Sequence, residues 1–353
     1  METDQESSSF SIEVAEQRHL MNLSFSGGGF RGLAFLGCVK ALQEKELVHS
    51  VKSFAGTSVG AIIATLLVAG ADYNYLKEVS LGACNFFSNY KLDFLSMIKR
   101  GSVNQLRSTF GVYKTDDLRE YIKKCLQNVL QIDYDITFDE LYSRNQVDLI
   151  ITASCLETST PFYFSHKTTK DTPVSEAVAI SCSIPFLFNK NIYDNKTLVD
   201  GCLIEKLPMQ CWPQEEIDYT MAFLLKSSRP NSTDTLSEYI NALQSSISLS
   251  IDDSYMMRYR NAITVINSGN IMGHGVMPST EEINKVIYAA YFQTLSELSR
   301  RNFIDECTIH QAHEISSLIV TDDHSKKKEY EYAIIEILII ILLVVIILKV
   351  IIT

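Results

Sequence analysis

The sequence has little positive charge, and this excludes one large class of functions. Its 353 residues include 31 Lys and Arg against 42 Asp and Glu, which gives a formal net charge of −11. Nucleic-acid binding requires a basic surface, so this balance argues against a nucleic-acid partner. The same charge provides no long-range attraction to anionic membranes, so any membrane attachment requires a local feature of the chain.

The chain also lacks paired cysteines and a secretion signal. Its eight cysteines form no Cys-x-x-Cys pair and show no regular spacing. Neither a zinc site nor a disulfide framework is indicated, and we expect no metal or other cofactor. Residues 1–18 begin with polar and acidic side chains and lack the basic and apolar regions of a signal peptide. We therefore expect a flexible leader and thiols that face a reducing cytosol.

A Gly-x-Ser-x-Gly motif spans Gly56 to Gly60, after the β-favouring residues 51–55 and before the apolar run 61–69. A strand, a sharp turn and a buried helix in this order predict the nucleophile elbow of serine hydrolases, with Ser58 as the nucleophile. The two glycines flank the serine because a β-carbon there would collide with the neighbouring strand and helix. The alternative is an ordinary strand–helix connection with a solvated serine.

A glycine-rich loop at residues 27–32 follows an alternating segment, 20–26, that predicts a strand. The loop fits the Gly-x-Gly-x-x-Gly dinucleotide fingerprint. That fingerprint also requires a carboxylate at the end of the next strand to hold the ribose. Here the next strand ends at residues 54–56 without a carboxylate, so the nucleotide interpretation is disfavoured.

The other interpretation of this loop is an oxyanion hole. Three consecutive glycines allow the backbone amides of Gly27, Gly28 and Gly29 to surround one oxygen atom, and the helix that follows adds its dipole. Arg31 would stabilise the loop or meet an anionic headgroup; the alternative is an ordinary surface arginine. Gly32 completes the loop at the start of the helix.

The glycine loop and the serine elbow together resemble the patatin-like phospholipases. That family pairs a Gly-Gly-Gly-x-Arg/Lys-Gly loop with Gly-x-Ser-x-Gly shortly downstream, as Gly27 to Gly32 and Gly56 to Gly60 do here. The resemblance covers roughly residues 20 to 226. It implies an α/β fold, a three-layer sandwich with a mainly parallel central sheet.

The resemblance also implies a catalytic base. Residues 173–188 are similar to the family's helix and Ser-x-Pro turn, and the Asp-Gly pair at Asp200 and Gly201 follows them. In the family this pair supplies the catalytic aspartate, whereas alone it would predict only a tight turn. Two departures affect this region: Cys202 stands where Gly or Ala is usual, and Lys206 stands where an asparagine is usual.

Residues 72–130 predict amphipathic helices with Phe86, Phe87, Phe94 and Phe110 among polar neighbours. A cap packed on the core and a lipid-facing lid both fit this pattern.

The predicted organisation has five parts: a leader at 1–18, a catalytic core at 19–227, a helical part of the same domain at 228–320, a charged linker at 321–332, and a transmembrane helix at 333–352.

The transmembrane prediction rests on an apolar run interrupted only by Glu336 and Lys349. A helix of this length spans about 30 Å, the thickness of a bilayer core, and charges near its ends can reach the headgroups. Lys326 to Lys328 precede the run and favour a cytosolic location for everything upstream. We expect a single-pass tail anchor with the catalytic domain facing the cytosol. A buried helix or an aggregation-prone strand is the alternative.

These observations predict a membrane-anchored serine acyl hydrolase whose partners are a lipid substrate and the bilayer. Ser58 and Asp200 would cleave fatty-acyl esters of phospholipids or related lipids through an acyl-enzyme. One alternative is an α/β-hydrolase triad of Ser58, Asp200 and His274. Another is a catalytically silent, membrane-anchored lipid-binding protein.

Overall fold

The computed structural model describes residues 18–89, 108–226, 233–234, 236–269, 271 and 277–304. The predicted transmembrane helix at 333–352, the linker at 321–332, nearly all of the leader, and His274 lie outside these residues. Within the described ranges, no helix is long and apolar enough to cross a membrane.

The central sheet has eight strands. They are β1 (Asn22–Phe25), β2 (Ser53–Thr57), β4 (Asp148–Cys155), β5 (Thr160–Phe164), β7 (Asn191–Tyr193), β8 (Lys196–Asp200), β9 (Thr220–Leu225) and β10 (Ile263–Ile266). Their order is β10-β9-β1-β2-β4-β8-β7, with β5 also paired to β4.

The sheet is mixed: its larger part is parallel, as expected, and an antiparallel part is added at β4. Strands β10, β9, β1, β2 and β4 are parallel. Strands β5 and β8 both run antiparallel to β4, and β7 pairs antiparallel with β8. The antiparallel pairings arise because β5 follows β4 in one hairpin and β8 follows β7 in another, and a hairpin needs no crossover helix, whereas a parallel connection does.

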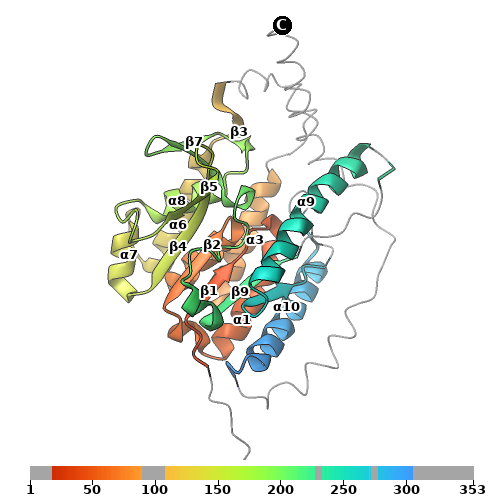
Figure 1. The fold of residues 1–353 in the computed structure, drawn as a ribbon. Helices are drawn as coiled ribbons and strands as arrows, with labels where there is room; N and C mark the ends of the chain where they lie inside the picture. Colours follow the sequence, from red (N-terminus) through yellow and green to blue (C-terminus); the bar gives the residue numbers. More distant parts are fainter. Residues whose placement is uncertain are drawn as a thin grey trace, which may run out of the picture.

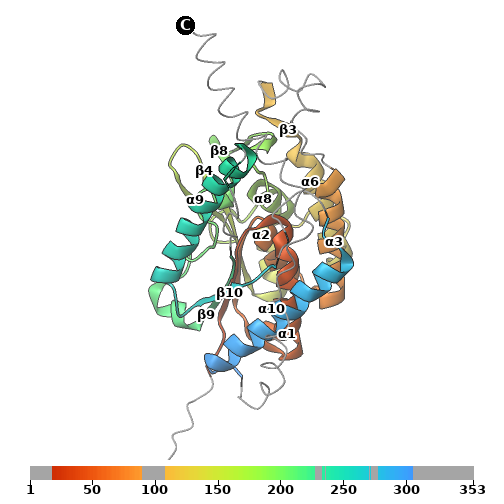
Figure 2. The same ribbon diagram turned by 90° about the vertical axis from the view of Figure 1, so that its right-hand side faces the viewer.

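Helices cover both faces of the sheet. They are α1 (Phe35–Glu44), α2 (Val59–Val68), α3 (Tyr73–Asn89), α6 (Thr115–Leu130), α7 (Phe138–Asn145), α8 (Val174–Ser181), α9 (Leu236–Arg258) and α10 (Thr280–Arg300). Figure 2 shows α9 on one side of β9 and β10, and α1, α2, α3 and α10 on the other. The three-layer arrangement expected from the resemblance is therefore present.

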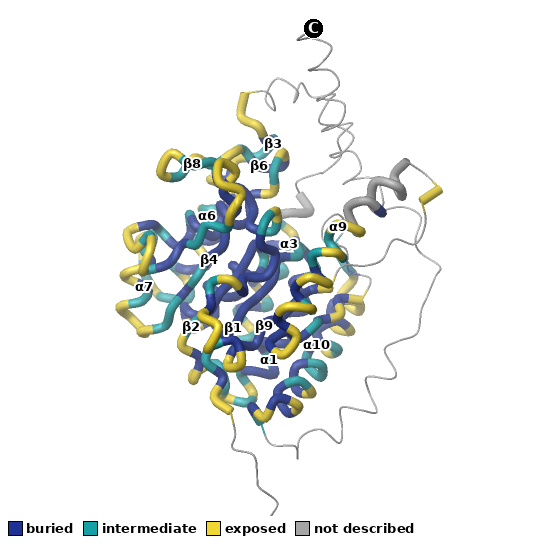
Figure 3. The backbone as a smooth tube through the Cα atoms, viewed as in Figure 1, coloured by how far each residue is buried: buried dark blue, intermediate teal, exposed yellow. Residues whose placement is uncertain are grey.

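Strand β9 shows how the sequence specifies this layering. All six of its residues are buried, as expected for a strand covered on both faces. Side chains alternate between the faces: Met221 and Phe223 enter the core formed with α1, α2 and α10, whereas Ala222 and Leu224 enter a second core that includes Tyr255 of α9. Figure 3 shows the sheet buried, with exposure concentrated on outer helix faces and turns.

Two short strands, β3 (Gly111–Tyr113) and β6 (Phe186–Phe188), form a separate parallel pair. Strand β3 lies within the stretch 72–130, which the sequence predicts to be largely helical. In Figure 1 this pair and β7 lie at the top, beyond the carboxyl ends of β1 and β2. The short sheet is thus at the end of the molecule where the candidate site lies.

Candidate active site

Ser58 and Asp200 come together because β2 and β8 share one edge of β4. Strand β2 pairs with β4 as far as Thr57 opposite Thr152, and β8 takes the next position, with Asp200 opposite Ala153. Strand β5 occupies the other edge of β4 along this stretch. Strands β2 and β8 therefore meet end to end from opposite directions, and the residue after β2 lies beside the last residue of β8.

Ser58 has the strained backbone of a nucleophile elbow. It immediately precedes α2 with φ 54° and ψ −122°, a conformation that non-glycine residues rarely adopt. Its backbone N–H donates to Ser181 Oγ at 2.9 Å, and Ser181 Oγ donates in turn to the carbonyl of Thr152 at 2.6 Å. Surrounding bonds of this kind allow a strained residue to persist. Ser181 could not be identified as a contact of Ser58 from the sequence, because it ends an apolar helix, α8, that carries no local sign of this contact.

The motif glycines sit where main chains approach closely. A β-carbon at Gly56 would collide with the carbonyl of Gly60, and one at Gly60 would collide with the carbonyl of Phe25 at the end of β1. Strand β2, the elbow and α2 can therefore pack only with hydrogen at these positions. Gly32 and Gly201 are also closely packed, against Val59 and the carbonyl of Thr152 respectively.

Asp200 is buried and accepts a hydrogen bond on each carboxylate oxygen. Ser58 Oγ donates to Asp200 Oδ2 at 2.9 Å, and the backbone N–H of Cys202 donates to Asp200 Oδ1 at 2.8 Å. Burial raises the pKa of the Asp200 carboxyl to about 6, although the hydrogen bonds from Cys202 and Ser58 oppose this effect. A carboxylate with a raised pKa, bonded directly to a serine hydroxyl, can accept its proton.

The glycine loop lies beside Ser58, but its three amides are not equivalent. The N–H of Gly27 donates to the carbonyl of Lys206 at 2.9 Å. The N–H groups of Gly28 and Gly29 have no protein acceptor among the described residues. These two amides are therefore available to bind an anionic oxygen, whereas the amide of Gly27 already donates to Lys206. The sequence could not distinguish the three glycines.

Arg31 binds the protein's own backbone around this loop. Its Nε donates to the carbonyl of Gly28 at 3.3 Å, and its Nη1 reaches the carbonyl of Lys226 at 3.4 Å. The guanidinium therefore joins the glycine loop to the residue that follows β9.

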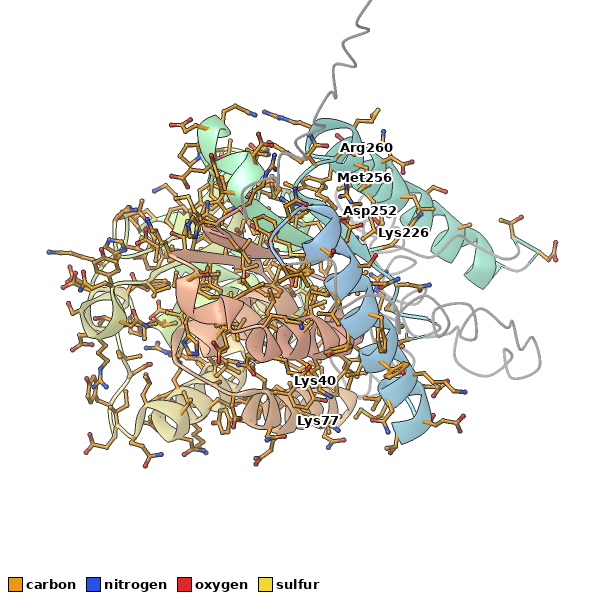
Figure 4. The ribbon with its side chains drawn as sticks, turned by 90° about the horizontal axis from the view of Figure 1, so that it is seen from below. Lys40, Lys77, Lys226, Asp252, Met256 and Arg260 are labelled. Atoms are coloured by element: carbon orange, nitrogen blue, oxygen red, sulfur yellow. The ribbon has the colours of Figure 1, made fainter. Side chains whose placement is uncertain are left out.

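The family departure at Lys206 has a partner that sequence spacing does not indicate. Lys206 Nζ lies 2.6 Å from Asp252 Oδ1 and 2.9 Å from the carbonyl of Leu225, and both charged residues are buried. Burial lowers the pKa of the Lys206 ammonium, and the Asp252 carboxylate opposes this shift. Figure 4 shows Asp252 and Met256 on the edge of α9 turned toward the rest of the molecule. The ion pair thus joins α9 to the segment that holds Gly27.

The second departure, Cys202, leaves the bond to Asp200 intact. The donor to Asp200 is the backbone N–H, which any residue except proline supplies. The Cys202 sulfur occupies the space that a β-carbon on Gly27 would need. The thiol therefore packs against the glycine loop.

No histidine of the described residues bonds to Ser58 or Asp200. His166 lies at the other end of β4, with Nδ1 2.8 Å from Oδ1 of Asp148. His274, the candidate third member of a triad, falls outside the described ranges.

Comparison with known proteins gives one family match. A family model described as patatin-like phospholipase matches residues 23–210, slightly more than half of the chain. The matched range contains the glycine loop, the elbow and the Asp-Gly turn.

Individual relatives are distant. An uncharacterized protein of Acanthamoeba polyphaga mimivirus, R571, is 26% identical over 223 residues, covering 62% of this chain and 70% of that protein. A probable lipid hydrolase of Invertebrate iridescent virus 6, 463L, is 25% identical over 203 residues, covering 57% and 65%. The crystal structure of VipD from Legionella pneumophila has a TM-score of 0.50 at 15% identity, covering 85% of this chain and 75% of that one. This structural likeness concerns the fold alone.

Proposed function

The chain belongs to the patatin-like phospholipase family, and from this premise we propose that it is a serine acyl hydrolase acting on fatty-acyl esters of phospholipids or related lipids. One observation carries the proposal: the hydroxyl of a strained serine donates at 2.9 Å to a buried carboxylate. The name of the viral relative, a probable lipid hydrolase, supports the same substrate class.

In the acylation step, Ser58 Oγ attacks the ester carbonyl carbon and its proton passes to Asp200 Oδ2. The carbonyl oxygen becomes an oxyanion, which the amides of Gly28 and Gly29 stabilise. When this intermediate collapses, the bond to the alcohol breaks and Asp200 returns the proton to the departing alkoxide. The acyl group remains on Ser58 as an ester.

In the deacylation step, a water molecule attacks the acyl carbon and Asp200 accepts its proton. The second oxyanion uses the same two amides. Its collapse breaks the bond to Ser58 Oγ, which regains the proton from Asp200, and the fatty acid leaves. The chain's own residues account for every proton in both steps.

We further propose that residues 333–352 anchor the protein in a membrane with its catalytic domain facing the cytosol. The support is the apolar sequence, since a helix of this length matches a bilayer core.

The test compares purified wild-type protein with Ser58→Ala and Asp200→Asn on phospholipid and triglyceride esters. Each variant should lose turnover by about a thousand-fold or more while remaining folded, because the two groups act as one unit. Ser50→Ala is the matched control, since Ser50 is an exposed serine whose hydroxyl donates to the nearby carbonyl of Leu47 in its own turn. Turnover retained by either dyad variant would exclude this mechanism. A wild-type protein that binds lipid without hydrolysing any ester would favour the silent lipid-binding alternative.

A further inference from the structure

Exposed apolar side chains are concentrated at the end of the molecule where the dyad lies. In the part of the chain that the structure describes, six of the eleven exposed large apolar or aromatic residues belong to this end. We call these six the apolar rim: Phe110, Leu156, Ile184, Phe186, Ile192 and Leu203. Phe186 and Ile192 lie in β6 and β7, and the other four lie in the segments next to β3, β4, β6 and β8. Figures 1 and 3 show β3, β6, β7 and β8 grouped beyond the carboxyl ends of the parallel strands. Single exposed apolar residues are ordinary, but a group beside a site indicates a binding surface.

The apolar rim is directly continuous with the dyad. The backbone N–H of Asp200 donates to the carbonyl of Ser183 at 2.9 Å, and Ile184 of the rim is the next residue. On the other side, Leu203 follows Cys202, whose N–H holds the Asp200 carboxylate. A molecule covering the rim would therefore lie against the entrance to the catalytic groups.

Two members of the rim combine exposure with backbone strain. Phe110 and Phe186 have φ values of 62° and 67°, and their side chains are 49% and 37% exposed. They lie side by side, because β3 pairs with β6 with Gly111 opposite Phe186. Glycine and asparagine adopt this left-handed backbone more readily than phenylalanine does. A phenylalanine ring is also more favourably placed in the core than on the surface. Strain of this kind occurs at functional sites, so the rings point to a contact outside the protein.

The charge around these rings is opposite to that of the whole chain. Residues 108–114 and 184–193 carry Lys114 and Lys190 and no acidic residue, in a chain of net charge −11, and the nearby Lys196 is paired with Asp194 at 3.3 Å. Lys190 Nζ lies 4.4 Å from the centre of the Phe110 ring. Aromatic rings with adjacent lysines suit the boundary of a bilayer, where acyl chains meet phosphate groups.

We propose that the apolar rim is a docking surface for a phospholipid bilayer. Phe110 and Phe186 enter the boundary between headgroups and acyl chains, and Lys190 lies at the level of the phosphates. This inference rests on the proposed lipid hydrolysis and makes it specific, because docking brings an ester to Ser58, which is itself only 8% exposed.

The test uses the full chain with Phe110 and Phe186 both changed to Asn. Asparagine tolerates the left-handed backbone, so this double variant should fold at least as well as the wild type while losing both rings. Tyr219→Asn is the matched control, because Tyr219 is an aromatic residue of similar exposure, 42%, just before β9 at the opposite end of the sheet.

The first measurement is hydrogen–deuterium exchange of the Ser58→Ala chain with vesicles of phosphatidylcholine and phosphatidylserine. Amides of residues 108–113 and 184–193 should become protected, and the two asparagines should abolish this protection. Locating the protection by residue separates docking from any binding through residues 333–352. Since Ser58→Ala cannot form an acyl-enzyme, this measurement stands even if the proposed hydrolysis is wrong.

The second measurement is turnover of the Ser58-containing chain. The double variant should lose about tenfold or more on vesicle phospholipid, the scale of removing two partly buried rings, and stay within about twofold of wild type on a monomeric short-chain ester. Unchanged exchange at both segments with vesicles would overturn the proposal, as would equal effects of the rim variant and Tyr219→Asn. Protection that appears without vesicles as the protein concentration rises would assign the rim to a second copy of the chain, and would overturn it too.

Discussion

The Ser58 hydroxyl donates directly to the Asp200 carboxylate at 2.9 Å, with no other side chain between them. This contact follows from the mixed sheet, because β8 runs opposite to β2 along the same edge of β4 and ends where β2 ends. A serine paired with a carboxylate needs a more basic carboxylate than an exposed aspartate provides. Burial of Asp200 supplies that basicity by raising its pKa.

Catalysis should therefore depend on pH through Asp200. Its carboxyl has a pKa raised to about 6, and only the ionised form can accept the serine proton. We expect kcat/KM to be low in acid, to rise through about pH 6, and to level off above it. The measurement is a pH–rate profile on a soluble ester whose alcohol does not ionise in this range. A rising limb centred near pH 4, the usual value for aspartate, would show that burial does not control the base.

The same burial of Asp200 should lower the stability of the folded protein once the carboxyl is ionised, and Asp200→Asn should remove this effect. The pKa of Asp200 in the folded state lies above its unfolded value, so the folded state binds the extra proton between about pH 4 and 6. The contribution of the Asp200 carboxyl to the free energy of unfolding is therefore largest in acid and decreases as pH rises through this window. At about pH 8, Asp200→Asn should be more stable than wild type by about 2–3 kcal/mol, and below about pH 4 the two should agree.

Urea unfolding at both pH values measures this difference. Asp171→Asn is the control, because Asp171 is an exposed aspartate and its removal should leave the stability nearly unchanged at either pH. A wild type that is more stable than Asp200→Asn at about pH 8 would contradict the argument.

His274→Ala separates the dyad from the alternative triad. Because Asp200 bonds directly to Ser58, the dyad assigns no proton transfer to His274, and we expect activity within a few-fold of wild type. Steady-state kinetics on one soluble ester is sufficient. A loss of about a thousand-fold, the scale of a triad member, would instead favour the α/β-hydrolase mechanism.

Several parts of this fold could be predicted from the sequence because their signals are local. The elbow needs glycines on both sides of Ser58, and the apolar run after it forms the buried helix α2. The strand expected at 20–26 is β1, and the strand expected before Lys226 is β9. In each case the residue pattern over fewer than ten positions determines the element.

Other parts depend on contacts between distant residues and gave no local signal. Strands β3 and β6 have three residues each and form only by pairing with each other. The direction of β8 is set by its pairings with β4 and β7, so the antiparallel part of the mainly parallel sheet was not predicted from the sequence. Lys206 was recognised as a departure from the family, but its partner Asp252 lies in another element. Which amides of the glycine loop are free also depends on Lys206.

Membrane attachment should depend on residues 333–352. Each buried branched side chain there contributes roughly 1.5–3 kcal/mol of transfer free energy, which summed over the run exceeds the cost of Glu336 and Lys349 near its ends. Deleting residues 333–353 should move the protein to the soluble fraction, with activity on dispersed short-chain esters retained and activity on bilayer lipid reduced. Carbonate-washed membranes provide the measurement, and deletion of residues 1–17 is the control. A full-length protein that washes off as readily as the truncated one would exclude a membrane span.

Breaking the buried ion pair of Lys206 and Asp252 should destabilise the protein strongly, whereas replacing both residues with apolar ones should not. Lys206→Met leaves the Asp252 carboxylate buried without the ammonium 2.6 Å away, which should destabilise the protein by about 3–5 kcal/mol. Adding Asp252→Leu removes the carboxylate that has lost the ammonium of Lys206, so the double variant should recover most of the loss. Lys285→Met is the matched control, because Lys285 pairs with Glu281 on the surface at 2.7 Å, and such exposed pairs contribute about 0.5 kcal/mol.

Urea unfolding of these variants and their turnover of a soluble ester test this argument together. The carbonyl of Lys206, rather than its ammonium, holds the N–H of Gly27. A refolded Lys206→Met/Asp252→Leu protein should therefore keep its activity within a few-fold, because the glycine loop retains its backbone anchor. A double variant as unstable as the single one would show that the two charged groups stabilise the protein through contacts other than their own ion pair. A stable but inactive double variant would show that the ammonium itself positions the loop.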